Sequence, residues 1–366
     1  MKVLFITPYP YNSAPSQRFR FEQYFRFFKE QNIQYNQEPF LDEKTWTVFY
    51  KKGNLHKKIW GILKGIIRRH AIIFKFNRYD FLFIHREACF IGPAYFEWLY
   101  SKIFRKKIIF DFDDAIWLRD VSEANNSLAW LKRSKKTNNI IGYASMVIGG
   151  NHYLVEFAKT HNQNCYVIPT TIDLAYHQIN SLSNRIETNE KIVIGWTGSV
   201  TTNRHFEMLL PVLKKIVVKY PDKIEFRTIS NKETEHSGLP VRFKKWEKET
   251  EIQDLASFDI GIMPLPDDEW AKGKCGLKGL QYMALEIPTI MSPVGVNTEI
   301  IKDGMNGFLA STEDEWIDML SKLIESRELR EKIGKEGRRT VVEKYSVEAN
   351  KQMYLDLFNQ MLKIKE

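Results

Sequence analysis

The most informative stretch of the chain is residues 272–295, KGKCGLKGLQYMALEIPTIMSPVG. Three glycines at intervals of three lead into a helical pattern, and two lysines lie between them. These residues are Gly273, Lys274, Gly276, Lys278 and Gly279. The backbone N–H groups of a glycine-rich turn at a helix start, together with lysine side chains, would hold a diphosphate. The alternative is an ordinary helix start whose lysines face solvent. Neither GxxxxGKS/T nor GxGxxG occurs, so the stretch is neither a Walker loop nor the common dinucleotide-binding loop.

Short apolar runs typical of buried strands alternate with helical patterns along most of the chain. The first run covers residues 2–7, and a helical pattern follows over residues 16–28. Later runs lie at 81–84, 107–110 and 146–149, and then at 192–196, 224–228, 259–263 and 288–291. This alternation predicts parallel sheets in two successive α/β domains, joined by a polar linker at residues 180–191. Residues 313–365 show the pattern of three amphipathic helices.

Further motifs surround the glycine-rich stretch. Residues 276–290, GLKGLQYMALEIPTI, are followed by Gly295, by Glu299-Ile-Ile and by residues 303–309, DGMNGFL. This order resembles the donor-binding half of GT-B glycosyltransferases, specifically glycosyltransferase family four, and a subgroup with a Gly-Lys-Cys-Gly-x-Lys signature. The resemblance extends over nearly the whole chain through residues 166–173 (YVIPTTID), 192–199 (IVIGWTGS) and 258–264 (FDIGIMP).

The resemblance implies an α/β fold of two Rossmann-like, doubly wound domains that face each other across a cleft. Residues 1–180 would form the acceptor-side domain, and residues 181–345 would form the domain that binds a nucleotide-sugar. Residues 346–366 would form a C-terminal helix that packs back on the first domain.

Two departures from the family pattern concern the donor site. The usual Glu-x7-Glu pair falls here on Gly273 and Gln281. The second position therefore keeps a hydrogen-bonding group for a ribose but brings no charge. The usual Arg and Lys after the first strand of the second domain are missing, since Trp196 and Thr201 stand there.

We therefore expect other cations to neutralise the diphosphate, namely Lys274 and Lys278 with Arg204. The base would lie against a loop at residues 243–246, near Pro264. The donor-binding set that the resemblance implies is Gly198, Ser199, Arg204, Trp246, Pro264, Lys274, Cys275, Gly276, Lys278 and Gln281. No obligatory cofactor or metal is expected, because such enzymes stabilise the leaving nucleoside diphosphate with cationic side chains.

Three carboxylates, Asp111, Asp113 and Asp114, end a strand-like run of the first half. Carboxylates that gather raise one another's pKa unless they are paired, so the cluster suggests a use. It resembles the nucleophile motif of haloacid-dehalogenase phosphatases, although the later lysine and acidic pair of that motif are not found. It also resembles the metal-binding Asp-x-Asp of the other glycosyltransferase fold. In family four a catalytic-site histidine often lies at this strand end, with Asp113 in its place here. The structural alternative is pairing with Arg86 or Arg119.

Other candidate site residues follow the first strands. Loops after parallel strands form the ligand-binding edge of such sheets, and arginines there can contact an acceptor or phosphates. The catalytic candidates are Asp113, Asp114 and His85, and the acceptor-side candidates are Arg18, Arg20, Arg86 and Glu87. Solvated or ion-paired arginines and a hydrogen-bonded, buried histidine are the structural alternatives.

The basic residues concentrate in the first half. The net charge is +9, with 26 Lys and Arg against 15 Asp and Glu in residues 1–180, and 28 against 30 in residues 181–366. From Leu55 to Phe76 there is no acid, and bulky apolar residues mix with cations at helical spacing. Such a segment can lie in an anionic membrane interface. Trp60, Leu63 and Ile67 would insert, and Lys57, Lys58, Lys64, Arg68 and Arg69 would meet headgroups. A domain helix with a solvated basic face is the alternative; nucleic acid ranks lower, because no nucleic-acid module accompanies the segment.

Length and composition limit the class of protein. With roughly 150 residues per domain, 366 residues suggest about two domains. The hydrophobic content of 43% suffices for globular cores. No apolar run approaches the roughly 18 residues of a spanning helix, and no signal peptide is recognised. Three scattered cysteines and eight histidines without HxxxH spacing indicate neither a disulfide framework nor a zinc site. We expect a cytoplasmic chain, at most peripheral on the inner face of the cell membrane.

The resemblance implies a function as well. The protein would be a hexosyltransferase-type glycosyltransferase that moves a sugar from a nucleotide-sugar to a glycan or lipid-linked acceptor, with retention of configuration. Surface polysaccharide synthesis of the bacterial type, for lipopolysaccharide, capsule or exopolysaccharide, is the expected role. The competing hypotheses are a GT-B-like subunit that binds nucleotide or glycan without turnover, and the phosphatase.

Overall fold

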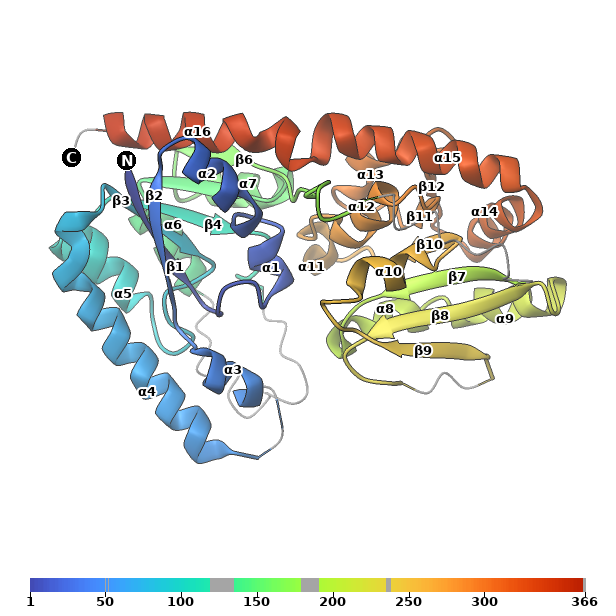
Figure 1. The fold of residues 1–366 in the computed structure, drawn as a ribbon, viewed down its shortest axis with the longest axis horizontal. Helices are drawn as coiled ribbons and strands as arrows, with labels where there is room; N and C mark the ends of the chain where they lie inside the picture. Colours follow the sequence, from blue (N-terminus) through green and yellow to red (C-terminus); the bar gives the residue numbers. More distant parts are fainter. Residues whose placement is uncertain (50, 52, 119–134, 179–190, 235–237, 365–366) are drawn as a thin grey trace. The chain divides into compact units, whose positions relative to one another are not determined.

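The computed structural model describes residues 1–49, 51, 53–118, 135–178, 191–234 and 238–364. These residues form two compact units (Figure 1). The first unit comprises Met1–Thr170, Gly273–Cys275 and Asn350–Glu366, and the second comprises Thr171–Lys272 and Gly276–Ala349. Of the predicted linker at residues 180–191, all but Lys191 lies outside the described residues.

Within the described residues, the first unit is built on a six-stranded sheet of order β2-β1-β3-β4-β5-β6. Its strands are β1 (Lys2–Thr7), β2 (Gln34–Pro39), β3 (Phe81–His85), β4 (Ile108–Phe112), β5 (Met146–Gly149) and β6 (Cys165–Val167). All neighbouring strands pair in parallel, as predicted. β1 lies between β2 and β3, so the order of the strands reverses there. Ligands of open α/β sheets bind at the carboxyl ends of the strands beside such a switch point.

Helices cover this sheet and complete its core. They are α1 (Pro15–Arg18), α2 (Phe25–Glu30), α3 (Glu43–Phe49), α4 (Leu55–Ala71), α5 (Tyr95–Trp98), α6 (Lys136–Tyr143), α7 (His152–Lys159) and the part of α16 (Val347–Lys363) from Asn350 onward. The central strands are buried on both faces, as parallel strands covered by helices are. Aromatic rings dominate the packing: Phe5 stacks on Phe21 at 5.3 Å, and Phe358 of α16 lies 5.2 Å from Phe28.

The prediction of a single helix over residues 16–28 is wrong. The structure has α1, a 3-10 turn at Glu22–Tyr24 and α2, and the helical geometry is interrupted at residues 19–21. The interruption turns Arg20 into the core, where its guanidinium meets the carboxylate of Asp111. This buried ion pair is a tertiary contact that helical periodicity does not indicate.

In the described part of the second unit, six parallel strands follow the order β12-β11-β10-β7-β8-β9. They are β7 (Ile192–Thr197), β8 (Ile224–Ser230), β9 (Val241–Lys245), β10 (Ile260–Met263), β11 (Thr289–Met291) and β12 (Phe308–Leu309). Here the strand order reverses between β7 and β10. The carboxyl ends of these two strands therefore mark the expected ligand-binding edge of the second sheet.

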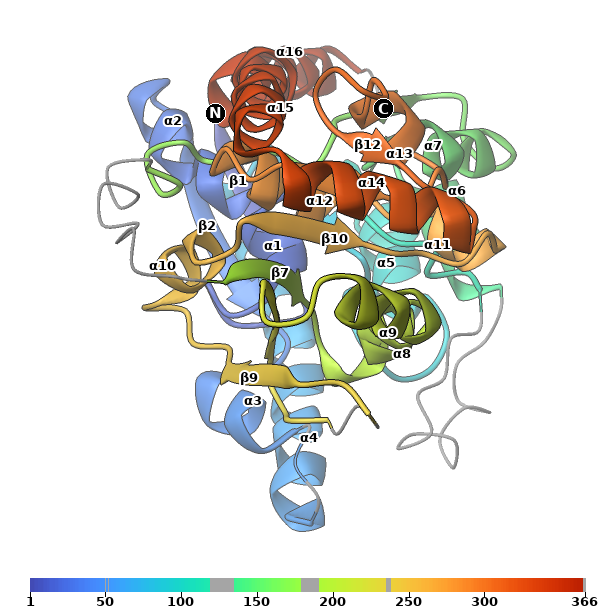
Figure 2. The same ribbon diagram turned by 90° about the vertical axis from the view of Figure 1, so that its right-hand side faces the viewer.

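The helices of the second unit pack on this sheet, largely through two apolar clusters. They are α8 (Asn203–Glu207), α9 (Leu210–Lys219), α10 (Glu251–Ala256), α11 (Glu269–Lys272), α12 (Leu277–Ala284), α13 (Asn297–Ile300), α14 (Glu313–Glu325) and α15 (Arg327–Thr340). Figure 2 labels α9 and α14 in the second unit. They contribute Leu213 and Leu320 to the larger cluster, and a 2.6 Å ion pair between Lys215 and Glu313 joins them.

Four strands were not predicted from the sequence: β2, β6, β9 and β12. They are the edge strands of the two sheets. The side chains of β2 and β9 are largely polar and partly exposed, and β6 and β12 are only three and two residues long, so none of the four has the apolar run of a central strand. The loop predicted at residues 243–246 is in part β9, which ends at Lys245.

Candidate functional site

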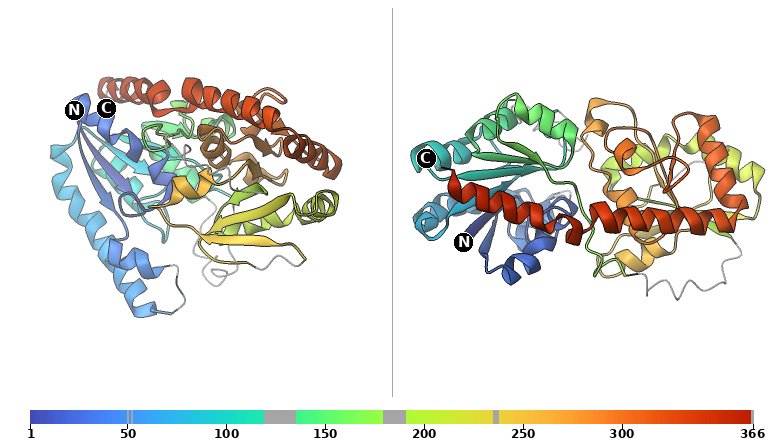
Figure 3. Two further views of the ribbon diagram at one scale, coloured as in Figure 1. Left: turned by 45° about the vertical axis from the view of Figure 1, so that its right-hand side comes forward. Right: turned by 90° about the horizontal axis from the view of Figure 1, so that it is seen from above.

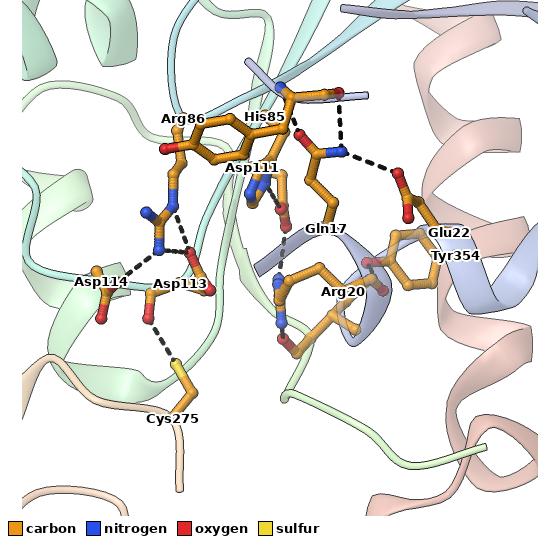
Figure 4. Close-up of polar contacts among 12 residues, drawn as sticks. Gln17, Arg20, Glu22, His85, Arg86, Asp111, Asp113, Asp114, Cys275 and Tyr354 are labelled. Carbon is orange, nitrogen blue, oxygen red and sulfur yellow. Dashed lines mark hydrogen bonds and ion pairs between the residues drawn. The ribbon is translucent and has the colours of Figure 1, made fainter. Parts of the chain in front are cut away.

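Arg20, His85 and Asp111 form a fully buried cluster in the first unit (Figure 4). One carboxylate oxygen of Asp111, in β4, lies 2.5 Å from the Arg20 guanidinium, and the other lies 2.7 Å from His85 Nδ1. Burial alone would raise the pKa of Asp111, but the charge of Arg20 and the hydrogen bond with His85 outweigh it. The pKa of Asp111 therefore lies below its ordinary value, and the cluster holds an ionised carboxylate inside the core.

The surroundings of Arg20 extend this cluster. Its guanidinium also donates to the carbonyl of Ile168, and its own carbonyl accepts a 2.9 Å hydrogen bond from the Tyr354 hydroxyl. Arg20 therefore lies in the core and not at a surface that an acceptor could reach, which corrects the sequence-based expectation. His85 Nε2 is buried and has no hydrogen-bond partner among the described residues.

Asp111 cannot serve as the nucleophile of a phosphatase in this structure. Its side chain is 0% exposed and lies between the Arg20 guanidinium and the His85 ring. A carboxylate that attacks phosphorus must reach the substrate, whereas this one is enclosed by side chains of its own unit. The phosphatase interpretation is thereby disfavoured.

A second charged cluster lies at the carboxyl end of the same sheet. Arg86 has a left-handed backbone, with φ 59°, and its guanidinium lies 2.7 Å from Asp113 and 2.5 Å from Asp114. Lys274 Nζ donates to the other oxygen of Asp114 at 2.8 Å. Burial would raise the pKa of Asp114, but Lys274 and Arg86 together hold it below its ordinary value. These contacts fit the predicted pairing with Arg86, and Arg119 lies outside the described residues.

Residues 273–275 belong to the first unit. The Cys275 thiol lies 3.2 Å from the carbonyl of Asp113, and the Asn151 amide donates to the carbonyl of Lys274 at 2.9 Å. Burial raises the pKa of Cys275, so the thiol stays protonated and packs as an apolar group. Gly273 lies against Ala115, because a Cβ at Gly273 would be 2.7 Å from that of Ala115.

The remaining acceptor-side candidates lie in different surroundings. Arg18 is 7% exposed and its guanidinium lies 5.1 Å from the ring centre of Phe19. Glu87 forms a 2.8 Å ion pair with Lys136. The structure thus brings Arg86 together with both candidate aspartates, whereas the contacts of Arg18 and Glu87 are with other residues.

The donor-side candidates of the second unit cluster around the end of β7. Gly198 follows this strand and donates to the carbonyl of Ile229, and Ser199 begins the next turn as an exposed N-cap. Arg204 is exposed on α8, five positions after Ser199. Pro264 directly follows β10, the other strand of the switch point. Four of the predicted residues therefore lie in segments that follow the strands at the expected edge.

Helix α12 brings further candidates to this region. Gly276, its N-cap, has φ 70°, a conformation that favours glycine. Lys278 Nζ lies 4.5 Å from the Trp196 ring and 3.5 Å from Thr202, beside the turn that Ser199 begins. Gly279 lies inside α12 and not in the turn before it. A side chain there would collide with Met291, since a Cβ would be 1.7 Å from the Met291 side chain. Only one of the three spaced glycines thus has a backbone conformation that favours glycine.

Gln281 and Trp246, two further donor-site candidates, lie in different surroundings. Gln281 is 4% exposed, and its amide nitrogen has no hydrogen-bond partner within the described ranges. Trp246 packs against the apolar cluster around Phe258, and its indole N–H donates to Glu251 at 3.2 Å. A buried amide without a partner is costly unless a ligand or water satisfies it.

Sequence reasoning missed several residues of the first cluster. Asp111 was recognised only as part of a carboxylate group, and Gln17, Glu22 and Tyr354 were not singled out. Glu22 is 5% exposed, and burial raises its pKa although the amides of Gln17 and Gln37 both donate to it at 2.9 Å. Within an apparently amphipathic helix, a glutamate gives no sign of being buried. In the described part of the chain, no three His, Cys, Asp or Glu side chains gather as metal ligands.

The architecture is that of the GT-B fold, with two parallel six-stranded sheets and helices. Sucrose-phosphate synthase (tll1590) from Thermosynechococcus elongatus has a similar structure, with a TM-score of 0.69, 12% identity and 98% of each chain covered. Alr3699/HepE from Anabaena, in complex with UDP-glucose, has a TM-score of 0.66 and 13% identity over 98% of this chain and 100% of that one. Likeness at this level of identity shows the fold.

Sequence comparison points to the second unit. Residues 191–326 match the family model described as "Glycosyl transferases group 1". The capsular polysaccharide biosynthesis glycosyltransferase CapM of Staphylococcus aureus is 24% identical over 188 residues, which cover 49% of this chain and 48% of CapM. The match thus spans about half the length of that relative. The family match falls almost entirely within the second unit.

Proposed function

We propose that the protein is a glycosyltransferase whose second unit binds a nucleotide-sugar donor. The observation that carries this proposal is the coincidence of the family-model match, residues 191–326, with the second sheet and its switch point between β7 and β10. The donor would bind at the carboxyl ends of these strands, where α/β sheets bind nucleotides.

The side chains at this edge suit a nucleoside diphosphate. Lys278 and Arg204 would supply positive charge to the diphosphate beside the turn of Ser199. Gln281 would offer its buried amide nitrogen to a ribose hydroxyl, which would satisfy a group that has no partner among the described residues. Because Alr3699/HepE forms complexes with UDP and UDP-glucose, UDP is the first nucleotide to test.

The first unit would present the acceptor and part of the catalytic machinery. Asp113 is 14% exposed and is oriented by Arg86, so it would act as an orienting group or base toward a sugar or acceptor hydroxyl. Stabilisation of the leaving diphosphate by cations would be the main catalytic effect. The transferred sugar would retain its anomeric configuration. The acceptor would be a glycan or a lipid-linked glycan of surface polysaccharide synthesis, and the lipid-linked form would bring the protein to the inner face of the cell membrane.

Thermal shift with UDP, GDP, ADP and UDP-glucose tests the donor site directly. One nucleotide is expected to raise the melting temperature, and Gln281→Ala should reduce that rise without changing the melting temperature of the free protein much. Val218→Ala, at an 82% exposed position on α9, is the matched control. Absence of any nucleotide effect would refute the proposal.

A second candidate function is a nucleotide- or glycan-binding subunit without turnover. It is favoured by Gly273 and Gln281, which stand where the family usually has two glutamates. Slow hydrolysis of the donor separates the two candidates, because a binding subunit stabilised by UDP should release no UDP from UDP-glucose.

A further inference from the structure

Helix α4 exposes a row of large apolar side chains on its outer side. The exposed fractions are 50% for Ile59, 58% for Trp60, 44% for Leu63 and 64% for Ile67. Figures 1 and 3 show α4 running along the outside of the first unit. Apolar surface of this extent on one helix is typical of an interaction site.

The opposite side of α4 is fixed to the first unit. A Cβ at Gly61 would lie 2.2 Å from Thr45, and one at Gly65 would lie 2.8 Å from Phe40, so both glycines allow close helix packing. At about 100° per residue, the apolar row spans an arc of about 100° directly opposite these glycines. The packing therefore dictates which side chains α4 presents to solvent.

Arg69 locks this orientation. It is 0% exposed and donates to the carbonyls of Thr7, Glu38 and Ala88. Arg68 donates to the carbonyl of Pro39. These two arginines were predicted to meet headgroups; Arg69 is instead a buried anchor, and Arg68 is turned toward the first unit.

The cations that remain beside the apolar row are lysines. Lys57 and Lys64 are exposed, whereas Lys58 is half-buried on the side of the glycines and donates to the carbonyl of Lys51. No acidic residue occurs from residue 44 to residue 79. Three acidic residues of neighbouring elements, Glu38, Asp42 and Glu43, line a hollow together with Arg68, which is 3.9 Å from Asp42.

The apolar surface continues beyond α4. The ring centres of His70 and Tyr95 are 5.9 Å apart, and those of Tyr95 and Trp98 are 6.3 Å apart. Tyr95 is 42% and Trp98 39% exposed. Tryptophan and tyrosine are the residues that favour the boundary between lipid and water.

We propose that this face, defined as Ile59, Trp60, Leu63, Ile67, Tyr95 and Trp98 with the lysines of α4, docks on an anionic lipid bilayer. The apolar side chains would enter the headgroup region while Lys57 and Lys64 remain at the anionic surface. Charge complementarity selects this occupant, because a second copy of the face would bring like charges together. In the described residues, no helix has the length and apolarity to cross a bilayer.

Vesicle flotation tests the proposal and needs no donor or acceptor, so its result is separate from that of the proposed function. The full chain is mixed with vesicles of phosphatidylcholine alone or with 30% phosphatidylglycerol. Flotation with the anionic vesicles should exceed that with the neutral ones at least tenfold and fall at high salt. A double variant, Trp60→Ser and Ile67→Ser, should lose most of this binding.

Two controls keep the test decisive. Val218→Ser, on α9, removes an 82% exposed apolar side chain elsewhere and should bind as the unaltered protein does. Unchanged thermal melting should show that the double variant is folded. The proposal is overturned by equal flotation with both vesicle types, by undiminished binding of the double variant, or by a dimer that the double variant abolishes.

Discussion

The carboxyl edges of the two sheets differ in how their polar groups are satisfied. At the edge of the first sheet, carboxylates are matched with cations: Asp111 with Arg20, and Asp113 and Asp114 with Arg86 and Lys274. In the second unit, the amide nitrogen of Gln281 and the amide oxygen of Asn297 are buried without partners among the described residues. Each unit also keeps a buried side-chain nitrogen without a partner among the described residues, on His85 and on Gln281, so the difference lies in the ion pairs that fix the first edge.

The largest expected effect concerns the buried charges of the first unit. Asp111→Ala leaves Arg20 buried without its carboxylate, and such a change costs about 3–5 kcal/mol. Urea unfolding measures the loss in the free energy of unfolding. The partly exposed pair provides the control, because Asp113→Ala leaves Arg86 its ion pair with Asp114 and should cost clearly less. Equal losses in the two variants would show that burial does not distinguish the two clusters.

Asp113→Asn should separate donor binding from transfer. We expect UDP to stabilise this variant as it does the unaltered protein, because Asp113 lies in the first unit. Turnover should fall by a factor of about 100 or more, as expected for loss of an acid–base group. Release of UDP in the presence of acceptor is the measurement, and turnover at the original rate would remove Asp113 from the catalytic residues.

The two lysines of the glycine-rich stretch should differ in their effect on nucleotide binding. Lys278→Ala should weaken UDP binding about tenfold, or about 1.4 kcal/mol. Lys274→Ala should have a smaller effect, because Lys274 already donates to Asp114. Calorimetric titration of both variants gives the comparison. A larger loss for Lys274→Ala would mean that this lysine leaves Asp114 to bind the diphosphate.

Acid should weaken the first unit through its paired carboxylates. The pKa of Asp114 in the folded protein lies below its ordinary value of 3.8, so its pairing stabilises the fold above that pH. As pH falls from 3.8 through the folded pKa, this stabilisation is lost. Urea midpoints between pH 6 and pH 3 should therefore decline, and less steeply in Asp114→Asn. Parallel curves for the two proteins would contradict the assignment.

The central strands of both sheets could be predicted from the sequence, and the edge strands could not. Parallel central strands such as β3 and β10 are buried on both faces and form apolar runs, so their positions are apparent. β2 and β9 each have one neighbour and carry polar, partly exposed side chains, and only pairing with that neighbour identifies them as strands.

The candidate site shows the same limit. The motif around Gly276 and the carboxylates at the end of β4 are local in sequence and could be recognised. The partner of each charge could not, because the contact between Arg20 and Asp111 spans 91 positions of the chain. Membership of a buried cluster follows from the topology of the sheet, which local periodicity does not encode.

The core of the first unit is complete only after helix α16, near the end of the chain, has been synthesised. Its Tyr354 and Phe358 pack on Tyr24 and Phe28, and the Tyr354 hydroxyl bonds to the carbonyl of Arg20, 334 positions earlier. Residues 1–170 therefore leave the ribosome well before part of their own core exists. Contacts of such long range slow folding. A nascent chain that stops before residue 350 would expose aromatic surface on its first unit and become a target for chaperones or aggregation.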